Sequence, residues 1–170
     1  QTVETGLQGI TFPVYSSAKH GPERAIELFR QTDGAVLLGL ESYRQGLDVQ
    51  GDRLRMVVLV RLPFPVPDDP LLQAREEREK EQGRNPFTSL QMPEMILKMR
   101  QGFGRLIRSS EDRGAVVILD PRVYTRPYGK TLLASLPPAR RTDSFEELDR
   151  WWKGIFMKPG KKALRGKVSI

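Results

Sequence analysis

Residues 56–62 read Met-Val-Val-Leu-Val-Arg-Leu, and residues 115–120 read Ala-Val-Val-Ile-Leu-Asp. Neither stretch alternates apolar with polar side chains, as a strand with one solvent-facing side does. Short continuous apolar runs of this kind are typical of strands buried on both faces, as in a parallel sheet covered by helices. Two more apolar runs lie at residues 10–15 and 35–40. The sequence therefore predicts four strands of a mainly parallel sheet.

Segments with the apolar spacing of helices lie between and after these runs. The predicted helices span residues 22–31, 69–83, 90–108, 128–136 and 144–156. The last one begins with Ser144 and carries Glu147 three residues later, which is the pattern of a capping box. Strands alternating with helices predict an α/β domain whose sheet is flanked by helices. In such domains the functional loops follow the carboxyl ends of the strands, here near Gly39, Leu62 and Asp120.

The composition is that of one soluble domain. The chain has 170 residues, of which 38% are hydrophobic and 29% charged. No stretch approaches the ~18 uninterrupted apolar residues of a membrane helix, so we expect no membrane partner. The absence of cysteine excludes disulfides, thiolate zinc sites and iron–sulfur ligation within these residues; it fits a reducing compartment, and cytoplasmic residence is the default expectation. The net charge of +7 favours a polyanionic partner such as nucleic acid.

The residues at the two ends of the chain suggest how it is organised. The first residue is Gln1 rather than methionine, which suggests a processed product or a piece of a larger protein. Glycines separate the lysines and arginines of residues 158–170, and we expect this stretch to be a basic tail. Residues 1–157 are then expected to form the folded domain.

Several residues that resemble parts of catalytic motifs have a simpler structural explanation. Gly129-Lys130-Thr131 resembles the end of a phosphate-binding P-loop, but Tyr124 stands where that motif needs a glycine. His20 is the only histidine, so it lacks a second histidine for a metal site or a catalytic pair. Asp68 and Asp69 lie at a predicted helix start, where acidic side chains favour the helix dipole. We expect a helix start, a loop histidine and a helix cap at these places.

One segment is harder to explain by packing. Residues 101–108 read Gln-Gly-Phe-Gly-Arg-Leu-Ile-Arg at the end of a predicted helix. At 3.6 residues per turn, one face of that helix carries Gln101, Gly104, Arg105 and Arg108. A glycine inside a helix costs about 1 kcal/mol relative to alanine. Packing of the helix alone therefore does not explain Gly102 and Gly104, whereas the close approach of another body does.

The same segment resembles motif VI of superfamily 2 helicases, whose pattern is Gln-x-x-Gly-Arg-x-x-Arg. Other pieces follow in the order found in the carboxyl-terminal lobe of DinG/XPD-like DNA helicases. They are Arg-Leu-Pro-Phe-Pro-Val-Pro at 61–67, Asn-Pro-Phe at 85–87, Asp-Arg-Gly at 112–114, Leu-Asp-Pro-Arg at 119–122 and Tyr-Gly at 128–129. The resemblance covers about residues 34–138. It implies that residues 1–157 form a RecA-like lobe that lacks its usual first strand and helix.

The resemblance also implies a division of labour. A first RecA-like lobe, in the same chain or in another one, would hold ATP and Mg²⁺, while this lobe closes over the nucleotide and grips single-stranded DNA. Arg105 and Arg108 are assigned as arginine fingers, because an arginine supplied across a cleft stabilises the charge of the phosphoryl-transfer transition state. Gln101 is assigned to the γ-phosphate or the attacking water, and Gly46 and Asp48 to a nucleotide-facing loop. No iron–sulfur cluster and no ATP hydrolysis are expected of this chain alone.

Residues 43–48 occupy the place of motif V but depart from the family pattern. Leu40 stands where threonine is usual, Arg44 replaces tryptophan, and Gln45 replaces glutamate. These departures leave a second hypothesis open, namely a non-catalytic nucleic-acid-binding or regulatory module derived from such a lobe. A third hypothesis, a small-molecule enzyme built on Gly129-Lys130-Thr131, has the least support.

Overall fold

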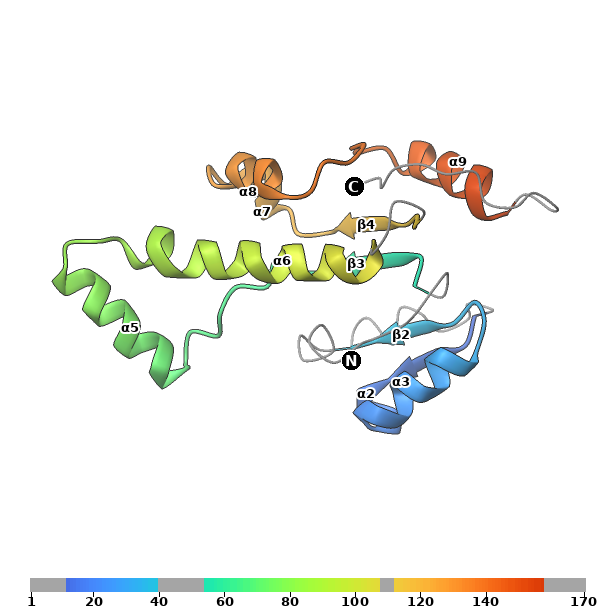
Figure 1. Ribbon diagram of the computed structural model, residues 1–170, viewed down its shortest axis with the longest axis horizontal. Coiled ribbons are helices and arrows are strands. Elements are labelled where there is room, and N and C mark those ends of the chain that lie inside the picture. The colour runs from blue at the N-terminus through green and yellow to red at the C-terminus, as the bar shows by residue number, and fades with distance from the viewer. Residues whose placement is uncertain (1–11, 40–53, 108–111, 158–170) are drawn as a thin grey trace. The chain divides into compact units, whose positions relative to one another are not determined.

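The computed structural model describes residues 12–39, 54–107 and 112–157. The chain divides into two units, Gln1–Leu54 and Arg55–Ile170. Within the described residues, each unit has one pair of parallel strands with helices packed against it (Figure 1). The predicted α/β class, with parallel strands flanked by helices, is therefore confirmed.

Residues 12–39, the described part of the first unit before Leu54, form a strand–helix–strand arrangement. Its elements are β1 (Val14–Ser16), α2 (Ser17–His20), α3 (Pro22–Gln31) and β2 (Val36–Leu38). The two strands are parallel, with Val14 opposite Val36. Helix α3 has the predicted bounds and buries Ala25 and Phe29. It follows Gly21, whose φ of 77° lies in the region that favours glycine. The short helix α2 was not predicted.

The second unit contains the remaining elements. They are β3 (Met56–Leu59), α5 (Pro70–Glu81), η2 (Phe87–Gln91), α6 (Met92–Leu106), β4 (Ala115–Ile118), α7 (Arg122–Thr125), α8 (Gly129–Ser135) and α9 (Phe145–Phe156). Strands β3 and β4 are parallel, with Met56 opposite Ala115 and Leu59 opposite Ile118. The element η2 is a single π-helical turn that leads directly into α6. The predicted helix at 90–108 therefore begins earlier, and the one-turn helix α7 was not predicted.

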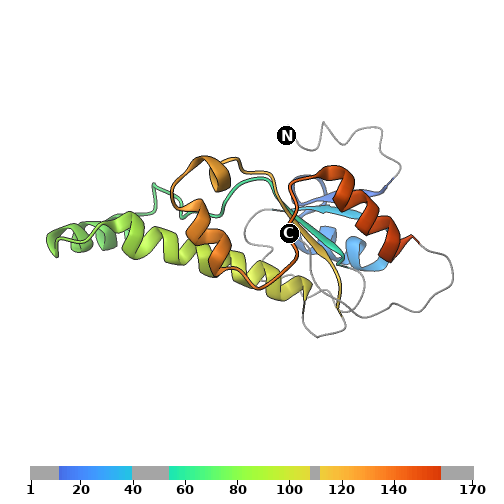
Figure 2. The ribbon, with the colours of Figure 1, turned by 90° about the horizontal axis from the view of Figure 1, so that it is seen from above.

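Helix α6 runs antiparallel to β3 and β4 (Figure 1; Figure 2). It buries one stripe at helical spacing, formed by Met95, Met99, Gly102, Phe103 and Leu106. Its carboxyl end lies at the start of the strands: a Cβ atom on Gly114 would come within 2.6 Å of the Leu106 side chain and 2.8 Å of the Arg55 carbonyl oxygen. The preceding turn lies past the other end of the strands, where Phe87 contacts Phe64 and Tyr128. The helix therefore runs along the strands, from their carboxyl ends to their amino ends.

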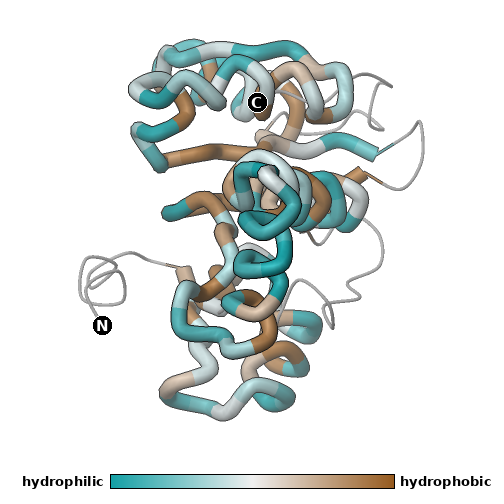
Figure 3. The backbone as a smooth tube through the Cα atoms, turned by 90° about the vertical axis from the view of Figure 1, so that its left-hand side faces the viewer, coloured by the Kyte–Doolittle hydropathy of each residue, from teal (hydrophilic) through white to brown (hydrophobic). Residues whose placement is uncertain are grey.

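Helix α5 buries only Leu72 and Glu79, and α9 buries no residue; Figure 3 shows hydrophilic and hydrophobic residues mixed along the backbone. The predicted cap of α5 is confirmed, because the Asp69 carboxylate accepts a hydrogen bond from the Leu71 backbone N–H at 2.9 Å. The capping box of α9 is half formed. Ser144 Oγ accepts from the Glu147 backbone N–H at 3.2 Å, but the Glu147 carboxylate accepts from Thr142 Oγ1 at 2.7 Å instead of the Ser144 N–H. Within the described ranges, no helix combines the length and apolarity needed to cross a membrane.

Candidate functional site

Residues 101–106 of the segment that resembles motif VI form the last turns of α6, near the amino ends of β3 and β4. Gln101 and Gly104 are exposed and Arg105 is partly exposed, whereas Phe103 and Leu106 are buried. The helix thus turns its polar positions away from the core, as the spacing predicts. Among the described residues, the Arg105 guanidinium has no carboxylate partner. A cation that is not neutralised is available to an anion from outside the described part of the chain.

The two glycines of this segment lie in different surroundings. A Cβ atom on Gly104 would have nothing within 4 Å, so no neighbour in the described structure requires a glycine there. Gly102 is buried on the packed stripe of α6. For Gly102 the expectation that packing gives no reason for a glycine stays a prediction. Gly104 alone leaves open space beside Arg105.

The structure describes only part of the set of residues assigned to the nucleotide site. Arg108, Gly46 and Asp48 lie outside the described residues, as do Leu40, Arg44 and Gln45 of the motif V region. The roles of Arg105 and Gln101 as a finger and a phosphate contact stay predictions.

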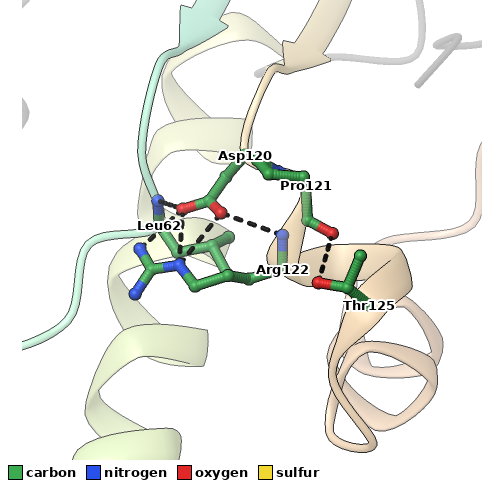
Figure 4. Close-up of polar contacts among 5 residues, drawn as sticks. All are labelled: Leu62, Asp120, Pro121, Arg122 and Thr125. Carbon is green, nitrogen blue, oxygen red and sulfur yellow. Dashed lines mark hydrogen bonds and ion pairs between the residues drawn. The ribbon is translucent and has the colours of Figure 1, made fainter.

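At the opposite, carboxyl edge of the two strands, Asp120 forms a polar clamp (Figure 4). Its buried carboxylate accepts hydrogen bonds from the Leu62 backbone N–H at 2.8 Å and from the Arg122 backbone N–H at 3.0 Å. It also accepts from Arg122 Nε at 2.9 Å and Nη2 at 2.6 Å. The loop after β3 and the loop after β4 are thereby joined through one side chain.

The surroundings of the Asp120 carboxyl favour its ionised form. The Arg122 side chain, followed by the Leu62 and Arg122 backbone N–H groups, keeps the pKa of the Asp120 carboxyl well below its usual range. Burial opposes this shift but does not outweigh it. Asp120 was predicted only as part of a motif and as a loop start. A single acid directly after a buried strand was the signal that could have identified it as a structural anion.

An aromatic cluster, Phe64, Phe87 and Tyr128, packs beside the clamp. The Phe64 ring lies 5.8 Å from Phe87 and 5.7 Å from Tyr128, and Phe87 lies 5.2 Å from Tyr128. The Arg122 guanidinium lies 5.2 Å from the centre of the Phe64 ring, a favourable cation–π distance. The three rings join the proline-rich loop after β3 to the starts of η2 and α8.

Gly129-Lys130-Thr131 is an ordinary helix start, as predicted. A Cβ atom on Gly129 would lie 1.7 Å from the Val123 carbonyl oxygen, so α7 and α8 approach each other at this glycine. The backbone of α7 fills the space on that side of Gly129, where a P-loop would curl around phosphate. Packing against α7 therefore explains Gly129, and residues 129–131 do not form a phosphate-binding loop.

The remaining candidates have structural roles. His20 ends helix α2 instead of lying in a loop, and its Nδ1 lies 3.2 Å from the Ser16 carbonyl oxygen. Its ring packs edge-on against Tyr15, with 5.6 Å between ring centres. In the parts of the chain that the structure describes, no group of three or more histidine, cysteine, aspartate or glutamate side chains could hold a metal ion.

Comparisons with known proteins agree with the resemblance to helicases. The sequence matches the helicase C-terminal domain family over residues 3–139. The ATP-dependent DNA helicase YoaA of Escherichia coli (strain K12) is 44% identical over 133 residues, which is 78% of this chain and 21% of that protein. The ATP-dependent helicase DinG of Mycobacterium tuberculosis (strain H37Rv) is 40% identical over 139 residues, 82% of this chain and 21% of that protein. The 3'-5' exonuclease DinG of Bacillus subtilis (strain 168) is 41% identical over 136 residues, 78% of this chain and 14% of that protein. The chain thus spans about a fifth, or less, of the length of these relatives.

Proposed function

The chain belongs to the helicase C-terminal domain family, in its DinG-like branch, and we propose that it is the second motor lobe of an ATP-dependent DNA helicase. We propose that residues 1–157 form one RecA-like lobe, because the family match spans residues 3–139 and so includes parts of both units. The P-loop and the Mg²⁺ site belong to a first lobe, in the same chain or in a partner. Residues 158–170 are a basic tail outside that lobe.

The observation that carries this proposal is the surface at the end of α6. Arg105 lies there without a carboxylate partner in the described structure, beside a glycine with open space around it. In phosphoryl transfer, charge accumulates on the γ-phosphoryl oxygens, and an arginine from across a cleft stabilises it. Arginine suits this role better than lysine, because its planar guanidinium donates two parallel hydrogen bonds and is always charged.

The other assigned residues complete the proposed nucleotide-facing surface. Arg108 is the second finger, and Gln101 contacts the γ-phosphate or the attacking water. Gly46 and Asp48 are proposed as further nucleotide-binding residues, and Asp48 as a partner of one of the arginines. These residues contribute no phosphate cradle, so the lobe is inactive without its partner lobe.

The decisive experiment uses the protein in which this chain is joined to a first lobe. We expect Arg105→Ala to lower DNA-stimulated ATP turnover (kcat) about a hundredfold or more, with a smaller change in KM, because a finger meets fully developed charge only in the transition state. Arg105→Lys should restore little activity, because an ammonium group cannot reproduce the fork. Steady-state phosphate release measures both effects.

Arg100 is a matched control, because it is an exposed arginine on the same helix. Arg100→Ala should leave turnover close to that of the unchanged protein, and thermal melts should show all three variants folded. Near-normal turnover in Arg105→Ala would remove the support for a finger at this position. The chain alone should release no phosphate and bind ATP no more tightly than about 1 mM, or about 4 kcal/mol.

The second candidate function is a non-catalytic nucleic-acid-binding or regulatory module. The substitutions in the motif V region, with Arg44 and Gln45 in place of the family's tryptophan and glutamate, favour it. The same assay separates the two functions. A protein with both lobes that binds DNA but shows no DNA-stimulated turnover supports the module.

A further inference from the structure

The corner formed by α7 and the start of α8 is held rigidly at the carboxyl edge of β3 and β4. Asp120 clamps the Arg122 backbone and side chain, and Thr125 Oγ1 donates to the Pro121 carbonyl oxygen at 3.0 Å (Figure 4). A tight turn follows, in which the Gly129 N–H donates to the Arg126 carbonyl oxygen at 3.0 Å. Groups on this corner are therefore already fixed before any ligand arrives.

The exposed side of this corner combines an aromatic ring with cations. Tyr124 is 74% exposed, although tyrosine carries a large apolar ring. Arg126 and Lys130 are exposed, and neither has an ion-pair partner among the described residues. The sequence contains no aspartate or glutamate between Asp120 and Asp143. No acidic side chain of this segment neutralises the two cations.

These groups match the chemistry of single-stranded nucleic acid. Proteins that bind it without sequence preference place aromatic rings against bases and cations along the phosphates. Arg122 does not contribute to this charge, because Asp120 already neutralises it. We infer that Tyr124 stacks on a base of single-stranded DNA, while Arg126 and Lys130 contact the flanking phosphates. This inference rests on the proposed motor-lobe function and adds the DNA-contacting residues to it.

The rigidity of the corner favours binding of a ligand. Ordering a flexible side chain or loop at an interface reduces affinity. Tyr124 lies on a helix turn that the Asp120 clamp and the close contact at Gly129 fix in place. The remaining ordering cost therefore falls mainly on the DNA strand and on the two long cationic side chains.

The test uses the full 170-residue chain and a fluorescein-labelled oligothymidylate, with binding measured by fluorescence anisotropy at several salt concentrations. Tyr124→Ala should weaken binding at least about fivefold, the lower end of the effect of removing one stacked base. Tyr124→Phe should bind nearly as well as the unchanged chain, because the ring remains. The double variant Arg126→Ala/Lys130→Ala should make the slope of log K against log salt shallower by about 1.4, since each phosphate contact to a single strand contributes about 0.7.

Two matched controls distinguish this corner from general surface effects. Phe145 on α9 is 76% exposed, much like Tyr124, and Arg75 on α5 is an exposed cation outside the corner. Phe145→Ala and Arg75→Ala should leave both the affinity and the salt slope unchanged. Equal losses in the control and corner variants would overturn the inference, because binding would then reflect net charge alone.

The outcomes also separate this inference from the proposed function. If the unchanged chain binds oligothymidylate and the corner variants bind equally well, the DNA contact lies elsewhere and the motor-lobe proposal survives. If the unchanged chain binds no oligothymidylate even at low salt, both the DNA grip and this corner are overturned. Loss of binding in Tyr124→Ala with retention in Tyr124→Phe supports a stacked base.

Discussion

Replacing Asp120 with alanine removes the acceptor that joins the loops after β3 and β4. Leu62 is only 4% exposed, so its backbone N–H loses its acceptor where water cannot easily replace it, at a cost of about 1–3 kcal/mol. The Arg122 side chain is 39% exposed, and its lost ion pair adds at most about 1 kcal/mol. We therefore expect Asp120→Ala to lower the free energy of unfolding by about 3 kcal/mol.

Thermal unfolding followed by circular dichroism measures this effect. In a protein of this size 1 kcal/mol shifts Tm by about 2–4 °C, so Asp120→Ala should lower Tm by roughly 6–12 °C. Asp120→Asn keeps one oxygen that can accept from the Leu62 N–H but loses the charge, and its Tm should lie between those of the other two proteins. A Tm for Asp120→Ala within about 1 °C of that of the unchanged protein would refute the clamp.

The pH dependence gives an independent check on the same carboxylate. Its pKa in the folded protein is lowered, chiefly by the hydrogen bonds from Arg122, while an unfolded aspartate titrates near pH ~3.9. The stabilisation is therefore fully present above about pH 4 and is lost as the pH falls through the folded-state pKa. The Tm difference between the unchanged protein and Asp120→Asn should narrow below about pH 4. A difference that stays constant down to pH ~2.5 would show that ionisation of Asp120 contributes nothing.

Three further predictions concern glycines and the α5 turn. Gly129→Ala should destabilise the fold by about 3 kcal/mol, because its Cβ would meet the Val123 carbonyl oxygen at 1.7 Å. Gly154→Ala on α9 should stabilise the fold by about 0.5–1 kcal/mol, because a Cβ atom there has nothing within 4 Å. Urea denaturation measures the free energy of unfolding of both variants. Gly104→Ala should also stabilise the isolated chain by about 1 kcal/mol yet lower ATP turnover once a first lobe is joined, and unchanged turnover would show that nothing approaches this glycine. Hydrogen bonds from Arg84 lower the pKa of Glu79 to about 2, so Glu79→Gln should expose the turn at Gly83 to faster tryptic cleavage after Arg84 at neutral pH, whereas Glu77→Gln should not.

The elements that local sequence determines were predictable. The apolar runs at 56–62 and 115–120 and the helix at 22–31 carry their signal in neighbouring residues, and the structure has strands and a helix there. Helix α7 was missed because one turn is too short to show a periodic pattern. Its stability comes from Asp120 and from the close contact at Gly129, neither of which a local window reveals.

The candidate site, too, was predictable from the sequence only in part. The spacing of residues 101–106 predicted which positions of α6 face outward, and the exposure of Gln101 and Gly104 agrees with it. The edge at which this segment lies was not predictable from spacing, because it depends on the antiparallel packing of α6 against the strands. The expectation that functional loops follow the carboxyl ends of the strands pointed to Leu62 and Asp120, whereas Arg105 lies at the amino end.

Helix α6 also fixes the distance and the relative rotation between Arg105, near the amino ends of the strands, and the aromatic cluster past their carboxyl ends. Its 15 residues correspond to a length of about 22 Å at about 1.5 Å per residue. One residue inserted after Met92 would rotate Arg105 by about 100° relative to the aromatic cluster at the other end. Seven inserted residues would nearly restore the rotation but move Arg105 about 10 Å farther along the axis. Insertions and deletions within α6, whether short or long, should therefore disturb the placement of Arg105 relative to the aromatic cluster.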